Sequence, residues 1–352
     1  MNLYVHFPFC RAKCAYCALL SRVGASAVAR ADHVARIVRD LPNGPLETVY
    51  FGGGTPALCD LAPVFEALSP RIDPAGGTEF TVELHPLDVK SSALESLRRG
   101  GVNRISLGVQ SFDDGVLNAM GRGHTAVEAE RAFREVKTVF PNAGMDLIAG
   151  WPGCSDGSWR ETLMRALALE PVHMSCYSLI HEPKTRLDLA VRKGALTLPD
   201  DDAALAQVSM AREAFAAAGL ARYEVSNYAR PGFECRHNCA VWRGEDYVGL
   251  GEGAHGRVGF ARTIGMATGY STEAVTPEED AFERAVLGLR TAFGIDLADI
   301  ANRHPLLAER LPAWRRSLEA LVAPGILRKA SSDRFVPTDR GFEVCDAVMA
   351  EL

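Results

Sequence analysis

The residues of this chain best suited to chemistry are three cysteines near its start. Cys10, Cys14 and Cys17 form a Cys-x3-Cys-x2-Cys pattern that directly follows an apolar run. A tetrahedral zinc site or an all-cysteine iron–sulfur cluster needs four protein ligands. The place expected for a fourth holds Leu19, and the next cysteine, Cys59, is distant. The pattern therefore predicts a cluster with one iron open to another ligand. A zinc site completed by a distant residue, or three unrelated buried thiols, are the alternatives.

Length and composition indicate a soluble globular protein. The 352 residues suffice for one large α/β domain and a smaller one, and the 47% hydrophobic content is ordinary. No stretch is apolar enough for a membrane span. The net charge of −6 argues against a nucleic-acid partner. An odd number of cysteines, nine, and no secretory signal indicate a cytoplasmic protein.

Six short runs rich in β-branched and aromatic residues predict strands, and the segments between them have helical spacing, as in 27–41 and 126–140. The six runs are Leu3–Phe7, Glu47–Phe51, Glu79–Leu84, Asn103–Val109, Met145–Ala149 and His173–Leu179. Strands that alternate with helices form parallel sheets through right-handed crossovers. The expected fold class is therefore α/β, a partial (β/α)6 barrel of TIM type, with its site at the carboxyl ends of the strands.

Glycines and polar or charged residues stand at or just after the ends of these predicted strands, where the site is expected. The second run leads into glycines 52–54, which let a ligand approach the backbone closely. Glu83, Gln110 and Asp146 end or interrupt the third, fourth and fifth runs, and Arg122 could supply a matching cation. Such side chains are costly in apolar strands unless they are paired, so together they predict a polar pocket. The alternative for each is a satisfied rim residue or a helix cap.

This combination resembles the radical S-adenosylmethionine (SAM) superfamily, in the branch of oxygen-independent coproporphyrinogen III oxidase. The resemblance implies a [4Fe-4S] cluster on Cys10, Cys14 and Cys17, with SAM on the open iron and cleaved to a 5′-deoxyadenosyl radical. It also implies a set of cofactor-binding residues. These are Tyr4 and Tyr16 flanking the cofactor, Gly53, Gly54 and Thr55 at its methionine part, and Glu83, Gln110, Arg122 and Asp146 contacting SAM. We expect an apolar barrel interior to keep such a radical from solvent.

A second signature follows the sixth run. His237 and Asn238 precede Trp242, and a glycine-rich stretch ends in His255. This pattern resembles the His-Asn-x-x-Tyr-Trp signature of HemW-type haem chaperones, although Val241 stands in place of the tyrosine. The resemblance implies haem as cargo and His237 as its ligand, since imidazole is a common iron donor. A hydrogen-bonded loop histidine is the alternative. We expect the segment to be a ribbon or loop over the barrel mouth.

Three domains are expected. Residues 1–185 would form the barrel, 186–274 a helix and β extension closing its mouth, and 275–352 a small helical, winged domain. In the last, 277–291 and 307–321 have helical spacing, and 325–327 and 334–338 predict a short β-wing. This domain shows no basic recognition helix typical of a DNA-binding protein.

The resemblance is compatible with two functions for this chain, one as a carrier and one as an enzyme. The carrier is a haem chaperone that delivers haem to haem-accepting proteins. The enzyme is an oxidoreductase of the coproporphyrinogen III dehydrogenase type, which forms protoporphyrinogen IX. Leu19, where the oxidase pattern has a fourth cysteine, and a first strand at residue 3, without the oxidase's N-terminal extension, favour the chaperone. A radical SAM methyltransferase or a cyclopropane-forming enzyme is a further alternative. An electron donor such as flavodoxin or ferredoxin is an implied partner.

Overall fold

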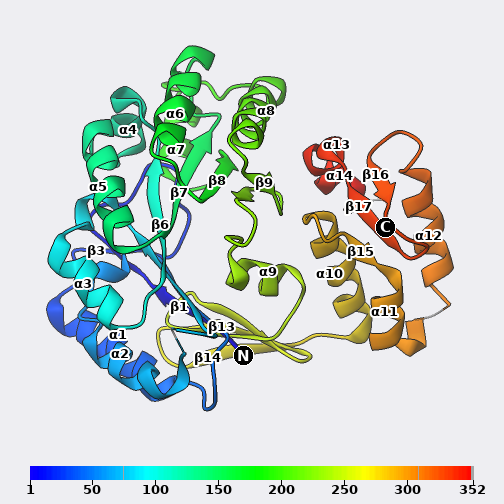
Figure 1. Cartoon of the computed structure of the whole chain (residues 1–352), viewed down its shortest axis with the longest axis horizontal. Coiled ribbons are helices and arrows are strands. Elements are labelled where there is room, and N and C mark those ends of the chain that lie inside the picture. The colour runs from blue at the N-terminus through cyan, green and yellow to red at the C-terminus, as the bar shows by residue number, and fades with distance from the viewer. Residues whose placement is uncertain (74, 308, 350–352) are drawn as a thin grey trace.

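Parallel pairing of six strands builds the centre of the molecule. In the computed structural model, which describes residues 1–73, 75–307 and 309–349, a twelve-stranded sheet has the order β14-β13-β12-β11-β1-β4-β5-β6-β7-β8-β10-β9. Figure 1 shows this sheet with helices packed around it and a separate small domain towards the C-terminus. The prediction of a partial barrel of six parallel strands is confirmed, because β1, β4, β5, β6, β7 and β8 are consecutive parallel neighbours.

The strands agree with the predicted runs to within three residues at each end. Those of the large sheet are β1 (Asn2–Phe7), β4 (Thr48–Gly53), β5 (Glu79–Leu84), β6 (Arg104–Gln110), β7 (Asn142–Ala149), β8 (His173–Ser178), β9 (Ala221–Arg222), β10 (Asn227–Ala229), β11 (Tyr247–Leu250), β12 (His255–Val258), β13 (Ala261–Gly265) and β14 (Tyr270–Ala274). Two smaller sheets contain β2 (Phe9–Cys10) with β3 (Arg22–Val23), and β15 (Ile295–Asp296) with β17 (Arg334–Pro337) and β16 (Leu327–Lys329).

The helices connect these strands and form the C-terminal domain. Those of the barrel and its extension are α1 (Ala27–Asp40), α2 (Ala62–Leu68), α3 (Ser91–Arg99), α4 (Asp114–Met120), α5 (Ala126–Val139), α6 (Asp156–Ala168), α7 (Arg186–Arg192), α8 (Asp201–Ala217) and α9 (Arg236–Trp242). The C-terminal domain has α10 (Pro277–Leu289), α11 (Leu297–Arg303), α12 (Leu311–Ala320), α13 (Asp339–Glu343) and α14 (Cys345–Met349). Short 3-10 turns are η1 (Pro56–Leu58), η2 (Ser69–Arg71), η3 (Pro86–Asp88) and η4 (Pro305–Leu307).

Side-chain alternation gives the central strands two different faces. One face is apolar and packs against the helices, as where Phe51 of β4 stacks on Phe65 of α2 with ring centroids 6.3 Å apart. The other face points into the barrel and is largely polar. There the Tyr4 and Tyr50 rings lie 6.1 Å apart, and Ser106 donates a hydrogen bond to Asp146. The strand side chains that face the interior are therefore more polar than expected, and the large apolar core lies between sheet and helices.

The extension after β8 joins both edges of the central sheet. Strand β10 pairs antiparallel with β8, and β11 pairs parallel with β1 on the opposite side. Helix α9 lies against β4 near its amino end, far from the cysteines that follow β1, whereas the turn after β11 reaches the cysteine loop through an Arg22–Glu252 ion pair of 2.6 Å. The segment around His237 is thus a short helix at the amino ends of the strands, not a ribbon over the mouth. Helical hydrogen bonds form from Cys235 onward, as where Cys239 N donates to the Cys235 carbonyl.

The C-terminal domain contains the predicted helices and β-wing. The helices expected over 277–291 and 307–321 are observed as α10 and α12, and the wing as β16 and β17. Residue 308 of the second predicted helix, and residues 350–352 of the predicted domain, lie outside the described residues. Among the residues that the structure describes, no helix has both the length and the apolarity needed to cross a membrane.

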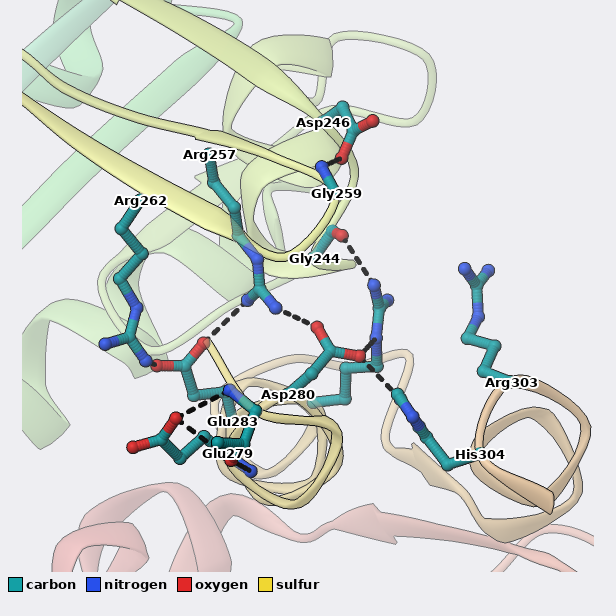
Figure 2. A network of polar contacts seen from close by, with 12 residues as sticks. Gly244, Asp246, Arg257, Gly259, Arg262, Glu279, Asp280, Glu283, Arg303 and His304 are labelled. Atoms are coloured by element: carbon teal, nitrogen blue, oxygen red, sulfur yellow. Dashed lines mark hydrogen bonds and ion pairs between the residues drawn. The ribbon is translucent and has the colours of Figure 1, made fainter. Parts of the chain in front are cut away.

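A buried network of charges joins this domain to the large sheet (Figure 2). Asp280, at the start of α10, accepts hydrogen bonds from Arg257 of β12, from Arg284 Nε at 2.7 Å and from His304 Nε2 at 2.6 Å. The Asp280 side chain is only 5% exposed. Glu283 pairs with Arg257 and with Arg262 of β13. A single carboxylate therefore holds three cationic or hydrogen-bonding side chains from both sides of the junction.

We expect Asp280→Asn to lower the free energy of unfolding by about 3–5 kcal/mol, because it leaves buried arginines without their counter-charge. Urea denaturation followed by far-UV circular dichroism measures the change. Glu278→Gln, on the exposed side of the same helical turn, is the matched control and should change stability by about 1 kcal/mol or less. Equal stability of the two variants would show that the network does not hold the junction.

Candidate functional site

A cavity of about 660 Å³ opens at the carboxyl ends of the parallel strands. It has the size of a small-molecule site and lies where this architecture places its chemistry. Eleven of the thirteen residues singled out from the sequence line it. They are Cys10, Cys14, Tyr16, Cys17, Gly53, Gly54, Thr55, Glu83, Gln110, Arg122 and Asp146. The topology therefore brings together residues that are up to 136 positions apart in the chain, from Cys10 to Asp146.

The cysteine loop is held at both ends by backbone hydrogen bonds. Strands β2 and β3 pair across its base, and Ala15 N donates to the Met120 carbonyl at 2.8 Å. Leu187 N, in α7, donates to the Ala15 carbonyl at 2.8 Å. The loop thus takes its shape from β1, α4 and α7 together, although its residues are contiguous in sequence.

The three thiols fit a multinuclear cluster better than a single metal ion. All nine cysteines are free thiols. Within the described residues, no three His, Cys, Asp or Glu side chains converge closely enough to hold one metal ion. Burial raises the pKa of Cys10 to about 11, and the neighbouring Cys17 and Cys14 act in the same direction. Three thiolates here need a cationic group between them, which an iron–sulfur cluster supplies.

The glycine turn after β4 forms a wall against this loop. Gly54 N donates to the Phe7 carbonyl and Thr55 N to the Phe9 carbonyl, each at 2.7 Å. A Cβ atom on Gly54 would lie 2.5 Å from the Phe9 carbonyl oxygen and 2.9 Å from Cys10 Sγ. Only glycine lets the two backbones approach this closely while leaving space beside the thiol.

Two half-buried carboxylates face the cavity, Glu83 from β5 and Asp146 from β7. Burial raises the pKa of Glu83 to about 7, and the nearby Asp146 adds to the rise. Burial also raises the pKa of Asp146, which accepts a hydrogen bond from Ser106 Oγ at 3.0 Å. Both oxygens of Glu83 accept hydrogen bonds, from Tyr50 Oη at 2.8 Å and from Gly53 N at 3.1 Å. The pair gives the cavity an anionic wall suited to a cationic ligand.

Gln110 and Arg122 lie together over Gly108. Gln110 has a left-handed backbone, with φ of 74°, at an irregularity in the pairing of β6 with β7. Strained conformations of this kind cluster at functional sites. Arg122 donates to the Gly108 carbonyl and, through Nη1, to Cys14 Sγ at 3.4 Å. Arg122 is therefore in contact with one of the proposed cluster ligands.

Tyr4 does not line the cavity. Its ring lies inside the barrel beside Tyr50, and its hydroxyl shares a hydrogen bond of 3.0 Å with His6 Nδ1. The structure thus places Tyr4 one layer below the residues that could touch a ligand.

His237 is even further from the cavity and is only 4% exposed. Asn2 Nδ2 donates to the Asp246 carbonyl, which leaves Asn2 Oδ1 to accept from Thr48 Oγ1 at 2.8 Å. Thr48 can then only accept from His237 Nδ1, also at 2.8 Å, so the ring carries its proton on Nδ1. Burial lowers the pKa of His237 to about 3, so the imidazole is neutral. Its tautomer suits a metal ligand through Nε2, but its burial does not.

The strand-based predictions omitted the part of the cavity formed by the end of β8 and the residues after it. This part consists of Tyr177, Ser178, Leu179, Ile180 and Glu182. The rule applied to the first five strands, that site residues end or follow each strand, would have found them at the sixth. His85, two residues after Glu83, also lines the cavity and was not predicted.

Comparison with known proteins identifies two matching family models. The radical SAM superfamily model matches residues 4–166, and the HemN C-terminal domain model matches residues 275–344. The chain is 33% identical to the heme chaperone HemW of Synechocystis, over 85% of this chain and 80% of that protein. It is 30% identical to the heme chaperone HemW of Bacillus subtilis over the full length of both proteins.

A solved structure has the same fold over nearly the whole chain. It is the coproporphyrinogen III oxidase HemN from Escherichia coli, described as a radical SAM enzyme, with a TM-score of 0.82. The match covers 99% of this chain and 89% of the oxidase at 20% sequence identity. At this identity the likeness establishes the fold alone, including the large sheet and the small C-terminal domain.

The close approach at Gly54 generates a prediction about metal content. We expect Gly54→Ala to reduce bound iron and sulfide several-fold after anaerobic reconstitution, because its Cβ atom would push the backbone and Cys10 Sγ apart. Iron and sulfide assays on purified protein measure this loss. Gly157→Ala is the control, because the nearest atom to its added Cβ lies 3.7 Å away. Full iron content in Gly54→Ala would contradict the fit of a cluster to this loop.

Proposed function

The chain belongs to the radical SAM superfamily and, within it, to the HemW-type proteins, and on that basis we propose that it binds haem and delivers it to haem proteins. The carrying observation is similarity along the whole length to proteins named heme chaperone HemW, at 30% identity over both full lengths in one case. In this proposal the cavity binds the cofactors of the carrier, and haem is the cargo.

We propose that Cys10, Cys14 and Cys17 hold a [4Fe-4S] cluster and that SAM occupies the adjoining cavity. When bound, the cluster supplies an electron to SAM. The chain's own residues bind and orient the cofactor. Glu83 and Asp146 offer carboxylates to its cationic groups, and the glycine turn after β4 leaves room beside Cys10. An electron donor such as flavodoxin or ferredoxin is a proposed partner, and a reducing cytoplasm is the proposed compartment.

Leu19 supports the carrier over the oxidase. It lines the cavity entrance and is 54% exposed, at the place where the oxidase pattern has a fourth cysteine. A cavity of about 660 Å³ also falls in the range of one small-molecule site, which favours SAM alone over SAM enclosed with a tetrapyrrole substrate. Haem carried as cargo needs no such enclosure. The oxidase is the alternative that the activity assay tests.

We propose two places for the haem, one from the signature and one from the geometry. The signature favours His237, whose neutral ring has Nδ1 anchored on Thr48, an arrangement that fixes the tautomer of iron-ligating histidines. The geometry opposes it, since haem could reach His237 only if α9 moved away from β4. The exposed apolar side chains Leu19, Leu20 and Ile180 near the cavity are a second place for a flat apolar ligand.

Haem titration tests whether the protein binds haem and distinguishes between the two proposed binding places. We expect the wild-type protein to give a saturable Soret change at micromolar haem, and His237→Ala to reduce its affinity about tenfold or more if the imidazole is a ligand. His181→Ala, which removes a 37%-exposed histidine next to Ile180, tests the second place. An unchanged titration in His237→Ala would place haem elsewhere, and no saturable change in the wild type would contradict haem carriage.

Activity separates the carrier from the enzymes. Reduced, reconstituted protein with SAM and coproporphyrinogen III should form no protoporphyrinogen IX beyond a single turnover, whereas labelled haem should pass to an apo-haem protein. Porphyrin analysis by chromatography and a transfer assay with haem-free acceptor measure the two results. Many turnovers of the oxidase reaction would overturn the proposed function.

A further inference from the structure

Tyr50 lies directly behind the cavity, where no role was predicted for it. It is the third residue of β4, and its ring points into the barrel beside Tyr4. Its hydroxyl donates to Glu83 Oε1 at 2.8 Å, while the Gly53 amide donates to Glu83 Oε2 at 3.1 Å. Both oxygens of the carboxylate are thus held from one strand.

The ring of Tyr50 is itself fixed by packing. Its centroid lies 5.2 Å from that of His237 and 6.1 Å from that of Tyr4. His237 cannot turn freely, because its Nδ1 is bonded to Thr48 two residues before Tyr50 on the same strand. Gly52 leaves the space that the Tyr50 and Glu83 side chains need, since a Cβ atom there would lie 3.0 Å from Tyr50 Cε1 and 3.1 Å from Glu83 Cδ. Tyr50 can therefore hold its hydroxyl in one place.

Ionisable groups from five other strands of the barrel surround Glu83. They are Tyr4 on β1, Tyr50 on β4, Arg104 on β6, Asp146 on β7 and Tyr177 on β8. Burial and Asp146 raise the pKa of Glu83 to about 7, and the hydrogen bonds from Tyr50 and Gly53 oppose that rise. Burial raises the pKa of Tyr50 well above its usual value, so its hydroxyl stays a donor at all pH values of interest.

We infer that Tyr50 is a positioning residue, which holds the Glu83 carboxylate ionised and aimed into the cavity to receive the cationic amino group of SAM. The inference rests on the proposed binding of SAM. It assigns Tyr50 an action through Glu83, without contact to the cofactor, since Tyr50 is absent from the residues that line the cavity.

The test is the pH dependence of SAM binding in Tyr50→Phe, which keeps the ring and removes only the donor. A hydrogen bond to a charged group contributes about 1.5–3 kcal/mol, so at pH 7 we expect SAM to bind about tenfold or more weakly. Ionised Glu83 is lost as pH falls through its pKa, and that pKa is higher in the variant. The loss of affinity should therefore begin at a higher pH, and the difference from wild type should shrink towards pH 9.

Equilibrium dialysis of SAM against protein of equal iron content, from pH 6 to pH 9, measures both effects. Tyr247→Phe is the matched control, because this tyrosine packs on His237 at 6.4 Å and has no bond to Glu83. Glu83→Gln should remove the pH dependence, and adding Tyr50→Phe to it should then have little further effect.

The outcomes separate the inference from the proposed function. Binding by Tyr50→Phe that equals wild type at every pH, or that is weaker by the same factor at every pH, would overturn the positioning role and leave SAM binding intact. Failure of the wild-type protein itself to bind SAM would instead refute the proposed cofactor, and the inference with it.

Discussion

Parallel pairing of β1, β4, β5, β6, β7 and β8 is the constraint on which the rest of the structure depends. Parallel strands bring all their carboxyl ends to one edge, so residues that are distant in sequence meet there. The cysteine loop, the glycine turn, Glu83, Gln110 and Asp146 all follow or end such strands. A shift of one residue in the register of β4 would turn Tyr50 towards the helices and Phe51 into the barrel.

The charged side chains of the central strands lie in the barrel interior, since the apolar core on the helix-facing side could not pair them. Glu83 and Asp146 lie half-buried beside tyrosine, serine and arginine side chains, and the fully buried Arg104 is among them. Burial, and the nearby Asp146, raise the pKa of Glu83 to about 7. A cationic ligand beside these carboxylates would favour their ionised form, as a sulfonium cofactor with an amino group would.

The two ends of the barrel are linked through Tyr50. His237 at the amino ends packs on the ring whose hydroxyl holds Glu83 at the carboxyl ends. A haem that took His237 Nε2 as ligand would need α9 to move away from β4, and this movement would withdraw the packing on Tyr50. Haem binding and cofactor binding would then each change the protein's affinity for the other ligand by the same factor, since such coupling is reciprocal.

The sequence by itself determined the order of strands and helices and most of the cavity. Alternation and turn residues located all six central strands. The rule that site residues follow strands, together with the family resemblance, named eleven of the lining residues, because the strand ends depend on local periodicity and their meeting on one topological fact. The sequence could not place Tyr4 or His237, nor reveal that Tyr50 acts on Glu83. Those positions depend on which face of a strand turns inward and on where α9 packs, and such contacts join residues as far apart in the chain as Thr48 and His237 or Tyr4 and His237. Only the tertiary structure decided that the histidine signature lies at the end of the barrel opposite the cysteines.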